Sequence, residues 1–277
     1  MKTYKRVLTI AGSDSGGGAG IQADIKTISA CGCYAMSAIT AITVQNTLSV
    51  TDIYNIPTRV VIGQINAVLD DIGADAIKIG MLSNSELILN IKSTLVKNNY
   101  TNIVLDPVMI STSGHKLIDD DALETLKHEL LYYARIITPN IPEAETLLKE
   151  KITSQKDLPK FARKISYASC ILNNDSKKRV SVLLKAGHLK DENINDIFYN
   201  AETDEIIELK SKRLDTPNTH GTGCTLSSAL ASFIAKGIDM NDAVRLAKEY
   251  ITKALISGKD YKIGHGNGPV DHFFALH

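Results

Sequence analysis

The residues with the clearest chemical potential lie in the stretch NTHGTGCTLSSALASFIAK, which runs from Asn218 to Lys236. Gly221 and Gly223 directly precede an apolar pattern with helical spacing. Two glycines at a helix start allow several backbone N–H groups to turn toward one point, where the helix dipole adds roughly half a positive charge. This stretch therefore predicts a site for an anion such as phosphate.

Cys224 stands at the edge of this predicted anion site. A thiol at a helix N-terminus has a lowered pKa, so we expect Cys224 to act as a base or a nucleophile. A purely structural alternative is a glycine-containing turn before a buried helix, in which Cys224 is a small core residue.

A second glycine-rich segment, GSDSGGGAG from Gly12 to Gly20, follows the apolar run 7–11 and precedes a helical face. A strand, a glycine loop and a helix in this order favour phosphate binding. However, no Lys-Ser/Thr pair follows the glycines, as it would in a P-loop, and the spacing is not G-x-G-x-x-G. The glycines would otherwise let the backbone approach a flat substrate closely, or simply form a flexible turn.

The apolar runs that we interpret as strands end in polar residues for which a core has no use. These residues are Gln45, Lys78, Asp106, Asn140 and Lys185. Ligands of open α/β sheets bind beyond the carboxyl ends of the strands, so we expect these side chains to share one crevice with the Gly221–Cys224 turn.

Asp106 of this group and Glu143, three residues after Asn140, suit Mg²⁺, which takes one or two carboxylates together with phosphate oxygens. Lys185 suits phosphate as a point charge. Each residue also has a structural explanation, because Asp-Pro marks turns, a glutamate is favoured in a first helical turn, and a lysine at a strand end is often solvated.

Short apolar strands alternate with amphipathic helices along the chain, which predicts a mostly parallel sheet with helices on both faces. The expected strands are 7–11, 38–44, 76–81, 103–105, 136–137 and 180–184, with a hairpin over 194–199 and 206–209. The expected helices follow Gly20, Pro57, Ser83, Asp119, Pro142, Leu158, Cys224 and Asn241. No internal repeat or linker divides the chain, so we expect one domain over residues 1–277.

The bulk composition suits one large globular domain or two small ones, because the chain has 277 residues, is 44% hydrophobic and has a formal net charge of zero. The absence of a basic excess argues against a nucleic-acid partner, and no apolar run reaches the roughly 20 residues of a membrane span. The N-terminal apolar run is too short for a signal peptide, so we expect a cytoplasmic protein with reduced thiols. Cys31 and Cys33 do not have a zinc-site spacing.

Eight segments together resemble the hydroxymethylpyrimidine/phosphomethylpyrimidine kinases of thiamine biosynthesis, in the ribokinase-like superfamily. In order they are AGSDSGGGAGIQADIKT, ITAITVQNT, KIGMLS, VLDPVM, ITPNIPEAE, LLKAGH, DTPNTHGTGCTLSSALA and IGHGNGPVDHF. The resemblance implies a three-layer α/β/α sandwich and two ATP-dependent steps. The first phosphorylates 4-amino-5-hydroxymethyl-2-methylpyrimidine, and the second converts the monophosphate to the pyrophosphate.

The resemblance also implies a role for each matching residue. Gln45 would hydrogen-bond the aminopyrimidine, because an amide offers both a donor and an acceptor. The other implied roles are a pyrimidine pocket of Gly12, Asp24, Met81 and Val108, Mg²⁺ near Asp106 and Glu143, ATP phosphates on Lys185, and an anion hole with a base at Gly221, Gly223 and Cys224. A homodimer is common in the superfamily.

Three departures from the family pattern bear on these roles. The first loop reads SDSGGG where the family usually has a proline, KAGH replaces the commoner KGGH, and residues 173–179 form an unusual polar insertion, which we expect to be a surface loop. Two alternatives stay open. One is a pyridoxal or pyridoxine kinase of the same superfamily, and the other is a non-catalytic protein that binds a vitamin precursor.

Overall fold

One sheet of nine strands forms the centre of the described structure, a computed structural model covering residues 2–109, 118–173, 179–189 and 191–277. The strand order is β3-β2-β1-β4-β5-β6-β7-β8-β9. The strands are β1 (Arg6–Asp14), β2 (Tyr34–Gln45), β3 (Val50–Asn55), β4 (Ala76–Ile79), β5 (Ile103–Leu105), β6 (Ile136–Ile137), β7 (Ser181–Leu184), β8 (Asn193–Asn200) and β9 (Glu205–Lys212). The strands from β2 to β7 in this order pair in parallel, whereas β3, β8 and β9 are antiparallel.

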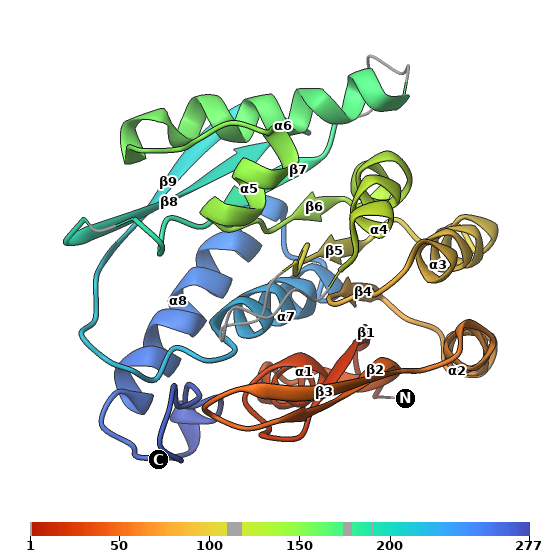
Figure 1. Cartoon of the computed structure of the whole chain (residues 1–277), viewed down its shortest axis with the longest axis horizontal. Helices are drawn as coiled ribbons and strands as arrows, with labels where there is room; N and C mark the ends of the chain where they lie inside the picture. The colour runs from red at the N-terminus through yellow and green to blue at the C-terminus, as the bar shows by residue number, and fades with distance from the viewer. Residues whose placement is uncertain (1, 110–117, 174–178, 190) are drawn as a thin grey trace.

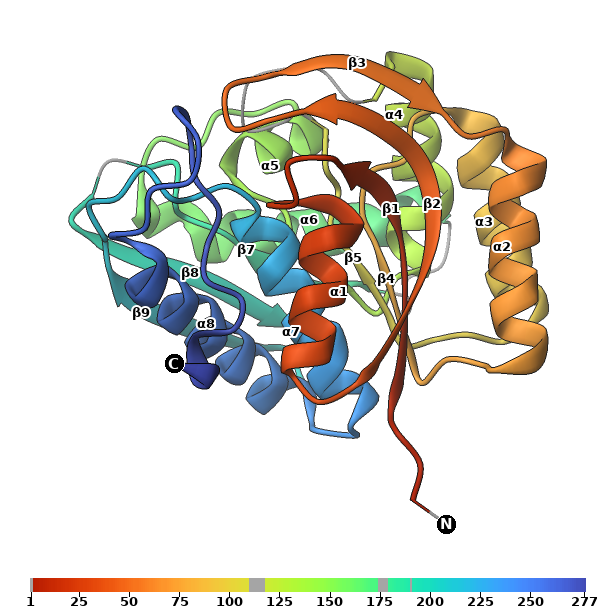
Figure 2. The same ribbon diagram turned by 90° about the horizontal axis from the view of Figure 1, so that it is seen from below.

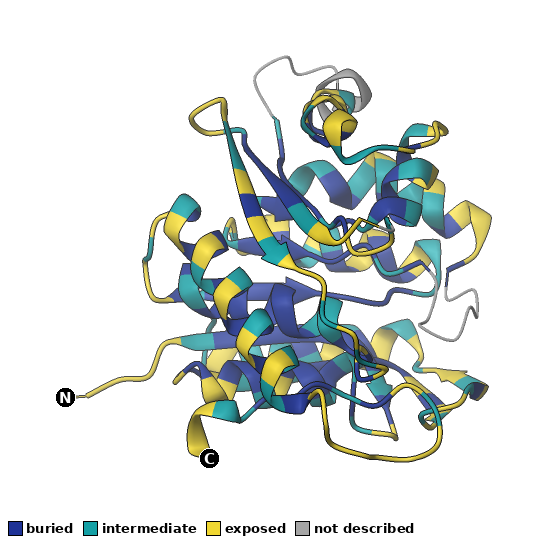
Figure 3. Ribbon diagram, turned by 90° about the vertical axis from the view of Figure 1, so that its left-hand side faces the viewer, coloured by how far each residue is buried: buried dark blue, intermediate teal, exposed yellow. Residues whose placement is uncertain are grey.

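Helices cover both faces of the sheet, so the predicted three layers are confirmed (Figure 1). On one face lie α1 (Gly20–Ala30), α7 (Thr222–Ala235) and α8 (Met240–Gly258). On the other lie α2 (Thr58–Asp71), α3 (Ser85–Lys97), α4 (Asp120–Thr125), α5 (Ile141–Leu148) and α6 (Leu158–Asn173). The strands β1, β4, β5, β6 and β7 between these layers are almost wholly buried (Figure 3). In contrast, β2, β3 and β9 carry exposed side chains, as do the outer faces of the helices.

Helix α7 is buried on nearly every side, because it packs on β1, β4 and β5 and is flanked by α1 and α8 (Figure 2). A helix in this position needs small residues where neighbouring backbones come close. Its serines, Ser227, Ser228 and Ser232, are fully buried and bond either a helix carbonyl or a buried carboxylate. The first residues of this helix line the same cleft as the residues at the carboxyl ends of the parallel strands.

Several element boundaries differ from the sequence-based expectation. Asn84, not Ser83, caps α3, because its side-chain oxygen accepts a hydrogen bond from the backbone N–H of Leu87. The helix that starts after Asp119 ends as an α-helix at Thr125 and continues as a π turn over Leu126–Leu130. Within the predicted polar loop 173–179, α6 reaches Asn173, and residues 174–178 lie outside the described residues.

Strand β3 was not predicted. Most of its six side chains are exposed or half-buried, so its sequence VTDIYN lacks the apolar run that marks the buried strands. It pairs with β2 at the edge of the sheet, where one neighbour suffices. Across the described residues, no helix combines the length and the apolar character needed to cross a bilayer.

Candidate active site

A cleft of about 670 Å³ opens at the carboxyl ends of the parallel strands. Every residue assigned to the site from the sequence, except Asp24, lines it. These lining residues are Gly12, Gln45, Met81, Asp106, Val108, Glu143, Lys185, Gly221, Gly223 and Cys224. The expectation of one shared crevice at the strand ends is therefore confirmed.

Gly221 sets the start of α7 and can only be a glycine. Its φ is +77°, a left-handed conformation, and a Cβ at this position would lie 1.8 Å from the carbonyl oxygen of Gly18. The two glycine-rich segments of the sequence are thus in backbone contact. Thr222, Gly223 and Cys224 all line the cleft, and the N–H groups of a first helical turn have no partner within the helix, as an anion site requires.

Gly223 brings the same helix end against two charged side chains. A Cβ on Gly223 would lie 3.2 Å from Lys185 Nζ and 3.4 Å from Asp106 Oδ2. Lys185 Nζ also donates to Asp106 Oδ1 over 3.0 Å, and Thr138 Oγ1 donates to the same oxygen over 2.8 Å. A cation, a carboxylate and a helix N-terminus therefore meet at one point of the cleft.

Burial alone would raise the pKa of Asp106, but Lys185 and Lys78 outweigh it and hold the pKa below its ordinary value. Asp106 is therefore an ionised carboxylate near neutral pH. Its Oδ1 accepts hydrogen bonds from Lys185 and Thr138, whereas its Oδ2 has only a long contact of 3.5 Å with the Ser227 hydroxyl. That oxygen is available to a cation bound in the cleft.

Glu143 belongs both to the cleft and to the start of α5. Its side chain accepts from the backbone N–H of Asn140 over 2.7 Å, and the Asn140 side chain accepts from Glu143 N–H over 2.9 Å, which is a capping box. Burial raises the pKa of Glu143 to about 7, with Asp106 adding to the rise and Lys185 opposing it. The structural and the functional interpretation of Glu143 are thus compatible.

The donor set suits Mg²⁺ that arrives with phosphate groups. Within the described residues, no three or more His, Cys, Asp and Glu side chains cluster to hold a metal. Mg²⁺ does not need such a cluster, because it keeps waters and takes one or two carboxylates plus phosphate oxygens. The hard oxygens of Asp106 and Glu143, both lining the cleft, fit this requirement.

The expected low pKa of Cys224 is wrong. Burial raises the pKa of this thiol to about 11, although Lys78 and the backbone of Gly20 oppose the rise. The loss of water around the sulfur outweighs the helix N-terminus. Cys224 is therefore a neutral thiol near pH 7, in contact with the cleft.

The position of Asp24 does not support its expected contact with the pyrimidine. Its side chain is fully buried behind the cleft and accepts hydrogen bonds from Thr9 Oγ1 over 2.6 Å, Ser228 Oγ over 2.7 Å and Lys78 Nζ over 2.9 Å. Lys78, which was expected in the crevice but had no predicted role, does line the cleft. Burial lowers the pKa of Lys78, but Asp24 outweighs it, so Lys78 is a buried ammonium.

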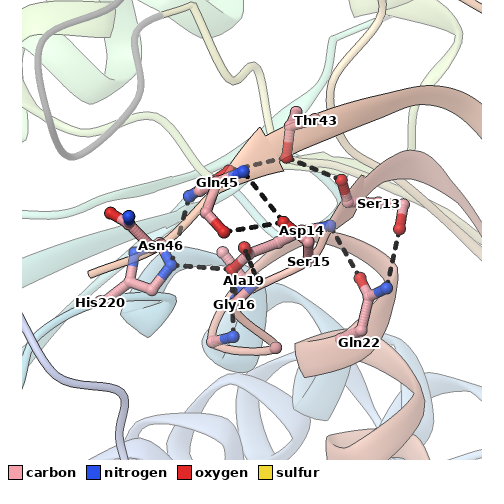
Figure 4. Close-up of polar contacts among 12 residues, drawn as sticks. Ser13, Asp14, Ser15, Gly16, Ala19, Gln22, Thr43, Gln45, Asn46 and His220 are labelled. Carbon is pink, nitrogen blue, oxygen red and sulfur yellow. Dashed lines mark hydrogen bonds and ion pairs between the residues drawn. The ribbon is translucent and has the colours of Figure 1, made fainter. Parts of the chain in front are cut away.

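Gln45, at the end of β2, lines the cleft together with Met81. A Cβ on Gly12 would lie 3.1 Å from Met81 Sδ, so a larger residue there would displace this methionine. His220 Nε2 lies 2.9 Å from Asp14 Oδ2 beside Gln45, and neither residue had a role predicted from the sequence (Figure 4). The signal was present, because His220 directly precedes Gly221.

Two comparisons identify the family to which this site belongs. A family model described as phosphomethylpyrimidine kinase matches residues 14–271. The hydroxymethylpyrimidine/phosphomethylpyrimidine kinase of Rhizobium meliloti is 44% identical over 266 residues, which are 96% of each protein. The chain belongs to the phosphomethylpyrimidine kinase family. It also spans 52% of a longer relative, the thiamine biosynthesis bifunctional protein ThiED of Geobacter sulfurreducens.

Solved structures confirm the ribokinase-like fold. The phosphomethylpyrimidine kinase of Clostridium difficile 630 matches with a TM-score of 0.77 and 43% identity, over 91% of this chain and 99% of that one. The pyridoxal kinase of Bacillus subtilis, solved as an ADP complex, matches with a TM-score of 0.87 and 33% identity, over 99% of both chains. The family of vitamin kinases therefore shares this chain's architecture.

We predict that Gly221→Ala abolishes binding of an ATP analogue, because the added methyl group collides with the Gly18 carbonyl and displaces the start of α7. Gly237→Ala is the matched control, since Gly237 has a φ of +78° but no atom within 4 Å of its Cβ position. Both variants carry the backbone strain of a left-handed residue. Calorimetric titration that finds equal affinity in the two variants would contradict the assignment.

Proposed function

We propose that this chain phosphorylates 4-amino-5-hydroxymethyl-2-methylpyrimidine with ATP and then converts the monophosphate to the pyrophosphate. The observation that carries the proposal is the meeting of Gly223, Lys185 and Asp106 at the N-terminus of α7, in the same cleft as Gln45. The first group suits the phosphates of ATP, and the amide suits an aminopyrimidine. The names of the relatives support both halves.

Phosphoryl transfer asks a protein mainly for positioning and for stabilisation of charge. In our proposal the backbone N–H groups that follow Gly221 and the Lys185 ammonium share the charge of the transferred group. Asp106 and Glu143 hold Mg²⁺, directly or through its waters, and the ion would neutralise phosphate charge. The fixed orientation of Lys185 by Asp106 limits reorganisation during the reaction.

The two proposed steps differ in their need for a base. The alcohol of the first step must lose a proton as the new O–P bond forms, and we assign its acceptance to the thiolate of Cys224. Lys78, buried beside Asp24, favours this thiolate and offsets part of the effect of burial. The phosphate monoester of the second step is largely deprotonated near neutrality and needs no base.

Cys224→Ala should therefore slow phosphorylation of the alcohol by about a hundredfold or more, the usual contribution of a general base, and slow that of the monophosphate much less. Cys33→Ala is the control, because Cys33 is a buried cysteine whose thiol bonds the Ser232 carbonyl. Rates measured separately with the purified alcohol and with the purified monophosphate test this prediction. Equal losses in both steps would refute the base role of Cys224.

The same assignment predicts a pH dependence. Because the pKa of Cys224 is about 11, its thiolate fraction rises about tenfold per pH unit at lower pH. We expect kcat/KM for the alcohol to increase from pH 7 to pH 9, while kcat/KM for the monophosphate lacks this increase. Stopped assays at each pH measure kcat/KM for the alcohol. If this kcat/KM still increases with pH in Cys224→Ala, the cysteine is not the source of the increase.

The alternative function is phosphorylation of pyridoxal, favoured by the structural likeness to the Bacillus subtilis pyridoxal kinase. The higher identity to phosphomethylpyrimidine kinases supports the pyrimidine. Steady-state kinetics with both compounds test the proposal directly, and we expect the larger kcat/KM for the pyrimidine. A larger value for pyridoxal, or no ATP turnover with either compound, would overturn it.

We further propose that the protein acts in the cytoplasm, as one domain, and as a homodimer. The outer face of the β2–β3 hairpin supports the dimer, because Ile42 and Tyr54 are cross-strand neighbours with 46% and 64% of their surface exposed, and Val44 lies beside them. An exposed apolar face of this kind suits contact with a second copy. Sedimentation at twice the chain mass of 30.1 kDa is the expected result.

A further inference from the structure

His220 Nε2 makes two contacts that constrain where its proton lies. It is 2.9 Å from Asp14 Oδ2, and 3.4 Å from the side-chain amide of Gln45, whose nitrogen faces it as drawn in Figure 4. Both members of the His220–Asp14 pair are buried. Because Asp14 and His220 have little water nearby, their hydrogen bonds must be satisfied by neighbouring side chains and by the surrounding backbone, whereas Gln45 is half-buried and lines the cleft.

Asp14 is an ionised carboxylate and can only accept. The backbone N–H groups of Gly16, Gly18 and Ala19 donate to it over 2.8 to 3.0 Å. Burial pushes its pKa up, but the hydrogen bonds of His220 and of these amides outweigh burial and hold the pKa below its ordinary value. Because Asp14 cannot donate, the ring must donate, so His220 Nε2 carries a hydrogen whether the ring is neutral or charged.

A protonated Nε2 has no lone pair with which to accept from an amide. If the Gln45 nitrogen faced it, two donors would confront each other at 3.4 Å. A half turn about the last side-chain torsion exchanges the oxygen and the nitrogen of a glutamine without moving the rest of the side chain. With Gln45 Oε1 on this side, the Nε2–H of His220 can donate a bifurcated hydrogen bond, mainly to Asp14 and more weakly to Gln45. This contact therefore favours Gln45 Oε1 toward His220.

A second contact, on the far side of the amide, leads independently to the same orientation. Thr43 Oγ1 lies 2.9 Å from the carbonyl oxygen of Ser13 and 3.0 Å from the other atom of the Gln45 amide. A hydroxyl has one hydrogen, and the Ser13 carbonyl can only accept it. The hydroxyl is then free only to accept from Gln45, which requires the NH₂ group on this side.

We propose that His220 and Thr43 are positioning residues that lock the Gln45 amide with its oxygen toward His220 and its NH₂ toward Thr43. The amide then presents one free lone pair and one free hydrogen to the cleft, in a fixed order. A matching ligand carries an acceptor ring nitrogen next to a ring carbon that bears a donor, as an aminopyrimidine does. This inference rests on the proposed function and explains how the site selects the aminopyrimidine.

Pyridoxal lacks that edge, because the two ring carbons beside its nitrogen carry a methyl group and a hydrogen instead of a donor. A freely rotating glutamine would adapt to either ring by turning its amide. A locked amide instead leaves a buried donor or acceptor without a partner when the wrong ring enters, and discrimination by such mismatches is large. The specificity would therefore depend on Thr43 and His220, which need not touch the substrate.

Thr43→Val keeps the size of the side chain and removes the hydroxyl, so it frees the amide to turn. We expect the KM for the pyrimidine alcohol to rise about tenfold, with kcat within about twofold and the KM for ATP unchanged. Thr43→Ser restores the hydroxyl and should restore the KM. Thr51→Val is the matched control, because the Thr51 hydroxyl bonds the Val44 carbonyl in the same hairpin and does not reach Gln45.

Nitrogen-15 NMR of the ligand-free protein tests the orientation without any assay. We expect a protonated Nε2 in His220; an unprotonated Nε2, or a Thr43→Val enzyme with the KM of the wild type, would overturn the inference. Failure of the proposed function is distinguishable from failure of this inference. A wild-type enzyme that does not turn over the pyrimidine refutes the function, while the NMR result still decides the orientation of the amide.

Discussion

The backbone contact between Gly18 and Gly221 is the constraint on which the site depends. It joins the loop after β1 to the first turn of α7, and it fits only because Gly221 lacks a Cβ and adopts a left-handed conformation. The small residues along α7 then allow that helix to lie deep against β1, β4 and β5. As a result, the first turn of α7 lies beside Lys185 and Asp106, whose strands end at the same edge of the sheet.

Burial decides the chemistry of the charged groups around this helix end. Asp24 and Lys78 are completely buried and form an ion pair in which Asp24 holds the pKa of Lys78 above its ordinary value, and Asp106 stays ionised because Lys185 and Lys78 lie near it. Cys224 lacks an ionic partner of equal strength, so the loss of water raises its pKa to about 11 despite the helix N-terminus. The same physical effect thus yields fixed charges beside a neutral thiol.

Sequence patterns predicted what depends on local spacing. The polar residues after each apolar run marked the strand ends, and parallel pairing then brought Gln45, Asp106 and Lys185 into one cleft. The resemblance to the kinase family implied that Asp24 belongs to the pyrimidine pocket, but the sequence does not show how deeply a polar residue is buried, and three hydrogen bonds hold Asp24 behind the cleft. Strand β3 was missed because an edge strand needs no apolar run.

The role of His220 needed the fold as well. Its partner Asp14 is far away in the sequence, and the proposed orientation of the Gln45 amide between His220 and Thr43 follows only from counting donors and acceptors in three dimensions. His220 contacts Gln45 and directly precedes Gly221, so the residue that we propose to orient Gln45 adjoins the turn that we propose to bind phosphate.

The central claim is that the transferred phosphoryl group lies on the N-terminus of α7 beside Lys185. A crystal structure with AMP-PCP and Mg²⁺ tests it most directly. Our account predicts that an oxygen of the terminal phosphate lies about 3 Å from the backbone nitrogen of Gly223 and from Lys185 Nζ. A terminal phosphate bound elsewhere in the cleft, with neither group in contact, would contradict the account.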